Sequence, residues 1–88
     1  MNLMKIASAV SGQVMGGDVV FDQVTTDTRV LNGGELFVAL AGDHYDGHDF
    51  IDEAKRSGAV AAMTSRPVDT DLPTLVVADT RRSLGQLA

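Results

Sequence analysis

The sequence has no cysteine and no tryptophan, and only two prolines and two histidines among its 88 residues. Without cysteine, the chain can form no disulfide framework and can bind no metal through thiolates. The longest unbroken apolar run, residues 36–41, is far shorter than the roughly 20 residues of a membrane-spanning helix. No basic lead-in with a cleavage site marks a signal peptide. These absences favour a cytoplasmic protein that is not inserted in a membrane.

Basic residues are also scarce, with seven Lys and Arg against twelve Asp and Glu, for a net charge of −5. A nucleic-acid-binding surface needs concentrated positive charge. Here the adjacent basic pairs are 55–56 and 81–82, and the other basic residues are scattered. The composition therefore excludes nucleic acid as an expected partner, although it leaves room for one local phosphate site.

The common nucleotide and metal motifs are missing. The sequence has no Gly-x-Gly-x-x-Gly, and neither lysine follows a glycine, so a phosphate loop ending in Gly-Lys-Ser/Thr is absent. His44 and His48 are four residues apart, but Gly47 and the loop before it make a shared helical face unfavourable. We therefore expect His44 and His48 to be solvent-exposed loop and helix-cap histidines. We expect no metal site and no catalytic residue in this chain.

The pattern of apolar and β-branched residues predicts one α/β domain covering residues 1–88. The predicted helices are residues 2–11, 48–57 and 80–88, and the predicted strands are residues 13–15, 19–29 (one or two strands), 35–40, 59–64 and 74–78. Strand–helix–strand order from residue 35 onward favours parallel pairing of the strands that contain Leu36 and Val60. The fold class is therefore a small mixed sheet flanked by helices. Because the last helix stops on an apolar stripe, we expect the domain to be a piece of a longer protein.

Residues 25–29 form the first candidate site. In a strand, Thr26 and Thr28 would face one side while Asp27 and Arg29 face the other. Threonine hydroxyls and a forked guanidinium suit phosphate oxygens. Asp27 would repel a diphosphate, so its expected role is to orient Arg29 or to bind backbone amides. The alternative is a solvated strand with an Asp27–Arg29 ion pair and no ligand.

Residues 42–49 form the second candidate site, between a buried strand and a helix, where ligand loops of α/β folds lie. The acidic residues Asp43 and Asp46 favour hydroxyl and N–H partners, and Tyr45 can stack on a base. The alternative is a capped turn in which Asp46 or His48 binds helix amides and Tyr45 covers the edge of the core. Together the two sites suggest a nucleoside-diphosphate ligand.

Four segments resemble the Mur ligases, which add to UDP-N-acetylmuramoyl-peptides: residues 25–29 (TTDTR), 34–42 (GELFVALAG), 46–51 (DGHDFI) and 58–59 (GA). Within the family, the chain is most similar to the type that joins D-alanyl-D-alanine to UDP-N-acetylmuramoyl-tripeptide (the MurF type). Four segments carry that similarity: residues 27–29, 48–50, 69–73 and 79–88.

The resemblance implies the N-terminal, UDP-binding domain of a three-domain cytoplasmic ligase of peptidoglycan synthesis. It implies that Thr28 matches the hydroxyl residue near the diphosphate, and that Asp43, His44, Tyr45 and Asp46 match the loop that lines the uridine. Thr26 and Arg29 are candidate phosphate ligands because of their own chemistry. The ATP and Mg²⁺ that such a ligase uses would bind to its central domain, and a C-terminal domain would complete the enzyme. One alternative is a MurE-type ligase that adds a diamino acid to the dipeptide precursor. Another is a free-standing nucleotide-sugar-binding module.

Overall fold

The computed structural model describes residues 1–41 and 46–87 as three helices, five strands and two 3₁₀ helices. In chain order they are α1 (Leu3–Val10), β1 (Gln13–Met15), β2 (Gln23–Thr25), η1 (Thr28–Val30), β3 (Glu35–Val38), η2 (Gly47–Phe50), α2 (Ile51–Arg56), β4 (Ala61–Thr64), β5 (Thr74–Val76) and α3 (Thr80–Leu87). Among these residues no helix is both long and apolar enough to cross a membrane.

The strands form one mixed sheet in the order β1-β5-β4-β3-β2. β1 runs antiparallel to β5, and the other neighbours are parallel. Leu36 of β3 pairs with Ala61 of β4, so the parallel pairing expected of these two strands is confirmed. The predicted small mixed sheet flanked by helices is therefore confirmed as well.

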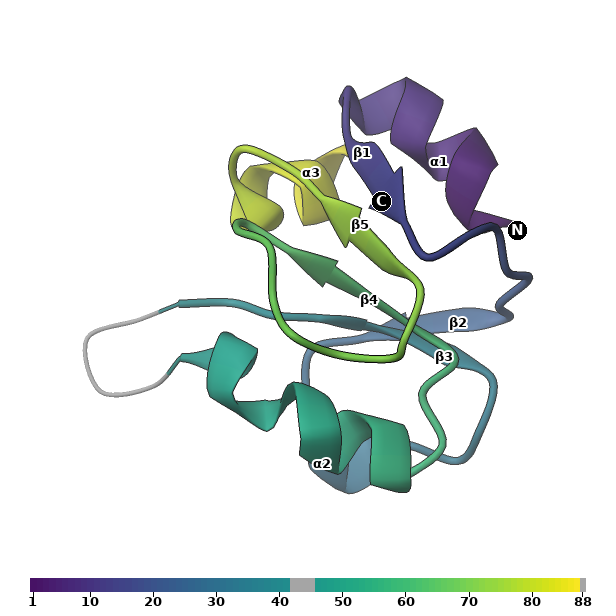
Figure 1. The fold of residues 1–88 in the computed structure, drawn as a ribbon, viewed down its shortest axis with the longest axis vertical. Coiled ribbons are helices and arrows are strands. Elements are labelled where there is room, and N and C mark those ends of the chain that lie inside the picture. Colours follow the sequence, from purple (N-terminus) through teal and green to yellow (C-terminus); the bar gives the residue numbers. More distant parts are fainter. Residues whose placement is uncertain (42–45, 88) are drawn as a thin grey trace.

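Helices cover both faces of the sheet, with α1 and α3 on one side and α2 on the other (Figure 1). Successive side chains of a strand point to opposite faces. Leu36 and Val38 therefore pack in the core beneath α1, whereas Phe37 and Ala39 pack beneath α2. This explains why residues 35–39 are buried without polar alternation.

The first helix is held at its start by a residue that the sequence pattern did not single out. Asp18 accepts the backbone N–H of Met4 at 2.9 Å and the side-chain amide of Asn2 at 2.8 Å. The Met4 amide is the largest cause of the lowered pKa of Asp18. At the other end, Ser11 takes the left-handed conformation (φ 58°), and Gly12 leaves room for Leu75, whose Cδ1 would lie 2.5 Å from a Cβ at Gly12.

Two predicted elements are partly wrong. The segment 19–29 contains a strand only at Gln23–Thr25, followed by η1. The segment 48–57 begins as the 3₁₀ helix η2 and becomes α-helical at Ile51. In both cases an aspartate accepts the backbone N–H two residues later, which favours a tight 3₁₀ turn at that point.

Candidate functional site

Residues 25–29 turn sharply at the end of β2. The Thr25 hydroxyl accepts the Asp27 N–H at 3.1 Å, and the Asp27 carboxylate accepts the Arg29 N–H at 2.9 Å. These side-chain bonds replace the pairing of a strand and begin η1 at Thr28. The expectation that Thr26 and Thr28 share one face of a strand is therefore wrong, because the strand ends at Thr25.

The expected Asp27–Arg29 pair is confirmed, and Asp27 both orients Arg29 and binds a backbone amide. Its carboxylate binds the Arg29 amide and also orients the guanidinium, with Nη2 at 2.8 Å from Oδ2 and Nε at 3.0 Å from Oδ1. The Arg29 side chain, followed by its backbone N–H, lowers the pKa of Asp27 to about 2. The Arg29 side chain is 86% exposed, so its guanidinium is held in place while facing solvent.

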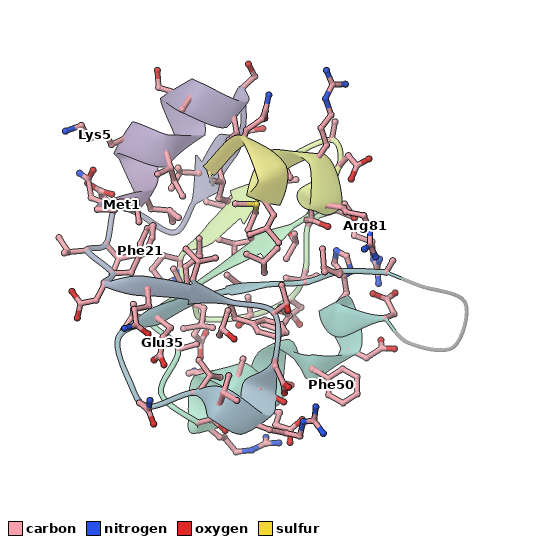
Figure 2. All side chains as sticks on the ribbon, turned by 180° about the vertical axis from the view of Figure 1, so that it is seen from behind. Met1, Lys5, Phe21, Glu35, Phe50 and Arg81 are labelled. Carbon is pink, nitrogen blue, oxygen red and sulfur yellow. The ribbon has the colours of Figure 1, made fainter. Side chains whose placement is uncertain are left out.

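A cleft of about 520 Å³ lies between η1 and the start of α2. It is lined by Thr26, Asp27, Thr28, Arg29, Phe50 and Glu53. The structure thus brings together the three predicted phosphate-site residues, despite the different local geometry. Phe50 and Glu53 also line the cleft, although the sequence alone did not indicate that they belong to the site. Figure 2 shows Phe50 on the α2 side of the sheet.

Asp43, His44 and Tyr45 of the second candidate site lie outside the described residues, whereas Asp46 is among them. Its Oδ1 accepts the His48 backbone N–H at 2.9 Å and contacts His48 Nδ1 at 2.6 Å. Its Oδ2 accepts Arg66 Nη2 at 3.1 Å. The His48 amide, then the imidazole and Arg66, lower the pKa of Asp46 to about 2. The Asp46 cap of the alternative turn is therefore present, whereas the place expected for Tyr45 lies outside the described residues.

His48 is buried, with 1% of its side chain exposed, so the expectation of a solvent-exposed histidine is wrong for this residue. Its Nε2 lies 3.0 Å from the Ser65 backbone nitrogen. A backbone N–H can only donate, so Nε2 must be the unprotonated acceptor and Nδ1 carries the proton donated to Asp46. The ring thereby joins η2 to the residue that follows β4.

Asp46, His48 and the Ser65 hydroxyl, 3.1 Å from Nε2, have the connectivity of a Ser-His-Asp triad. A triad histidine needs a free Nε2 lone pair to accept the serine proton. Here the Ser65 backbone N–H occupies that position. The arrangement is therefore a structural hydrogen-bond network, and it does not activate Ser65 as a nucleophile. Within residues 1–41 and 46–87, no cluster of three or more His, Cys, Asp or Glu side chains could hold a metal ion.

With this geometry established, comparison with known proteins decides the family. A sequence profile described as "Mur ligase family, catalytic domain" matches residues 20–88. The chain belongs to the Mur ligase family. It is 51% identical over 86 residues to the UDP-N-acetylmuramoyl-tripeptide–D-alanyl-D-alanine ligase of Escherichia coli (strain K12), covering 98% of this chain and 19% of that one.

Other Mur ligases are also similar. A UDP-N-acetylmuramoyl-L-alanyl-D-glutamate–2,6-diaminopimelate ligase of Aquifex aeolicus (strain VF5) is 42% identical over 65 residues, covering 74% of this chain and 14% of the relative. A crystal structure of MurF from Acinetobacter baumannii superposes with a TM-score of 0.83 at 32% identity, covering 96% of this chain and 19% of that one. The chain therefore spans about a fifth or less of the length of these relatives.

Proposed function

We propose that this chain is the N-terminal, UDP-binding domain of a Mur ligase that joins D-alanyl-D-alanine to UDP-N-acetylmuramoyl-tripeptide. The observation that carries the choice of ligase is the 51% identity, over 98% of the chain, to an enzyme of that name. The proposed partners are the UDP-N-acetylmuramoyl-peptide and the central and C-terminal domains of the same protein. The proposed enzyme is cytoplasmic.

The cleft between η1 and α2 supports a site for the UDP part of the substrate. Thr26 and Thr28 bring hydroxyl groups that can donate to phosphate oxygens without adding charge, and Arg29 brings a preoriented guanidinium. Asp27 and Glu53 also line the cleft, so two carboxylates accompany the single cation. We assign the diphosphate to the Thr28–Arg29 end of the cleft, and the uridine to the segment that contains Asp43, His44, Tyr45 and Asp46.

The proposed chemistry of the whole ligase does not occur in this chain. ATP and Mg²⁺ would supply the activation of the substrate carboxyl group as an acyl phosphate. The sequence contains no Gly-Lys-Ser/Thr loop that could cradle ATP phosphates, so these residues do not fit ATP and its metal. What the chain itself contributes is binding and orientation of the nucleotide end of the substrate.

A second candidate is a ligase that adds a diamino acid to the dipeptide precursor. The observation in its favour is the similarity to 2,6-diaminopimelate ligases, at 42% identity over 74% of the chain. Both candidates use a UDP-linked substrate, so the UDP site is common to them. Activity of the complete ligase with the tripeptide and the dipeptide precursor would distinguish the two.

The test of the binding site is an NMR titration of the chain with UDP. We expect backbone amide shifts to cluster at residues 25–29 and 46–53, and at the amides of 42–45. The same titration with Thr28→Ala should require a higher UDP concentration. Ser8→Ala, which removes an exposed hydroxyl on α1, is the control and should titrate like the wild type. Shifts confined to other surfaces would refute the site.

A further inference from the structure

The 3₁₀ helix η2 is attached to the sheet at its first residue. Ala41 and Asp46 form an isolated antiparallel bridge, and the Gly47 N–H donates to the Leu40 carbonyl at 2.7 Å. A Cβ at Gly47 would lie 2.8 Å from the Leu40 backbone nitrogen, so the two backbones are in close contact. η2 ends at Phe50, which lines the same cleft as Thr28.

The side chains of Asp46, His48 and Arg66 hold η2 in this position. Asp46 accepts the His48 amide, His48 Nδ1 and Arg66 Nη2, at 2.9, 2.6 and 3.1 Å. His48 Nε2 in turn accepts the Ser65 N–H at 3.0 Å. Ser65 and Arg66 directly follow β4, so the start of η2 is tied to the carboxyl end of the central strand.

On the other strand of the bridge, Arg81 Nη2 lies 3.5 Å from the Ala41 carbonyl, and Figure 2 shows Arg81 on the α3 side of the sheet.

We propose that His48 and Arg66 are positioning residues for the nucleotide cleft: they hold Asp46, and through it η2, so that Phe50 lines the cleft together with Thr28. This inference rests on the proposed function, because it assumes that the cleft binds UDP. It also gives the Asp46 carboxylate a structural role within the segment proposed to line the uridine, since both of its oxygens accept hydrogen bonds from the chain. Preorganised walls lower the ordering cost of ligand binding, which is how residues outside the cleft affect affinity.

The variants separate the individual bonds. His48→Asn can place an N–H where Nδ1 lies, but its side chain cannot reach Ser65. His48→Gln can place an acceptor near the position of Nε2, but it loses the contact with Asp46. Arg66→Met removes the donor to Asp46, and Arg66→Lys restores a cationic donor. Arg56→Met makes the same change at an exposed arginine in the last turn of α2 and serves as the control. Ser65→Ala keeps the backbone N–H that binds Nε2, so it should behave like the wild type.

The experiment is an NMR titration of the chain and its variants with UDP, alongside denaturant unfolding of each protein. If the loss of positioning costs as much free energy as one net hydrogen bond, UDP should bind roughly 2- to 10-fold more weakly. We expect that loss of affinity for Arg66→Met. Arg66→Lys should recover the affinity, and Arg56→Met should bind UDP like the wild type. His48→Asn and His48→Gln should each weaken binding, and the Phe50 amide signal should move in the unliganded variants.

The outcomes are distinguishable from failure of the proposed function. If wild-type chain gives no response to UDP, the proposed function fails and this inference fails with it. If the wild type binds and Thr28→Ala weakens binding, but Arg66→Met and the His48 variants bind as well as the wild type, the inference alone is wrong. Reduced unfolding stability with unchanged UDP affinity would show a purely structural role and would also overturn it. Because Arg66 is a surface residue with about half of its side chain exposed, Arg66→Met is expected to fold.

Discussion

Thr28 is the residue at which the proposed substrate contact is most easily tested. It is the first residue of η1 and lines the cleft beside Arg29. In a ligase that contains this chain, Thr28→Ala should remove one hydrogen bond to a charged group, a loss of about 1.5–3 kcal/mol. That corresponds to roughly 10- to 150-fold weaker use of the UDP-linked substrate.

The change should appear in the Michaelis constant for the UDP-linked substrate and not in that for ATP, because binding common to ground state and transition state is lost. Steady-state kinetics with each substrate varied in turn measures the two constants, with Ser8→Ala as the control. An unchanged constant for the UDP-linked substrate would mean that Thr28 makes no important contact with it.

Asp27 and Asp46 should make the stability of the chain depend on acid pH. Each has a pKa lowered to about 2 in the folded chain, below the ordinary value of 3.8. A carboxylate with a lowered folded pKa stabilises the fold fully above its unfolded pKa, and this contribution is lost as pH falls through the folded pKa. We therefore expect the free energy of unfolding to decline from about pH 5 toward pH 2.

Urea unfolding at a series of pH values measures this decline in the wild type, Asp27→Asn and Asp46→Asn. Each variant should be less stable than the wild type at pH 7 and should lose less stability on acidification. A variant whose stability falls with pH as steeply as that of the wild type would show that the substituted carboxylate does not contribute.

At the scale of elements, the turn after α2 depends on a glycine that no other residue can replace without cost. Gly58 has φ 110°, and a Cβ there would lie 2.8 Å from the Cα of Gly33 in the turn before β3. Gly17 has a similar φ of 98°, but within the described part of the chain no atom beyond its two chain neighbours lies within 4 Å of a Cβ at this position. Gly17→Ala should therefore cost only backbone strain, about 1–3 kcal/mol, and Gly58→Ala should cost more than that.

Denaturant midpoints of the two variants, measured in parallel, give the comparison directly. The difference between them isolates the contact with Gly33, because the backbone strain is similar at the two positions. Equal losses would mean that the Gly33 turn moves aside without cost.

Local sequence signals predicted most elements because they depend on near neighbours. The helical spacing of Leu3, Ile6, Ala7 and Val10, the apolar run of β3 and the glycine after α2 are all confirmed. Contacts of Asp27 and Asp46 with backbone amides were also anticipated, but the backbone conformations that go with such contacts were not. Asp27 and Asp46 each begin a 3₁₀ helix, and buried Glu35 accepts the amides of residues 32 and 33 at 2.7 Å.

The candidate site could be predicted only in part for the same reason. Thr26, Thr28 and Arg29 are close in sequence, so their proximity required no knowledge of the fold. Phe50 reaches the same cleft only because α2 packs on the sheet beside η1. The His48–Ser65 bond joins residues 17 apart, and no local pattern reports it.

For the whole molecule, the sheet order predicts which backbone amides are best protected. β4 is the central strand, with β3 and β5 beside it, while β1 and β2 form the edges. The interior strands bring most of the largest buried side chains, among them Phe37, Met63 and Leu75. Amide exchange from core strands requires the largest openings of a fold.

Hydrogen exchange followed by NMR should therefore give the slowest rates at residues 36–38, 61–64 and 75–77, with β1 and β2 faster. Exchange in β4 as fast as in the edge strands would contradict the assignment of the core.

ATP is the nucleotide that we expect this chain not to use. We expect the isolated chain to bind UDP but neither to bind nor to hydrolyse ATP. A triphosphate needs a cradle of backbone N–H groups with a lysine and a metal ion, and the sequence has no Gly-Lys-Ser/Thr loop for it. The net charge of −5 and the two carboxylates of the cleft also oppose free ATP, which is more negatively charged than UDP. Titration with UDP and with ATP plus Mg²⁺, together with a phosphate-release assay, tests this selectivity. ATP turnover that copurifies with the chain and is altered in Thr28→Ala or Arg66→Met would show that these residues contain catalytic machinery, and the assignment of a binding domain would then have to be abandoned.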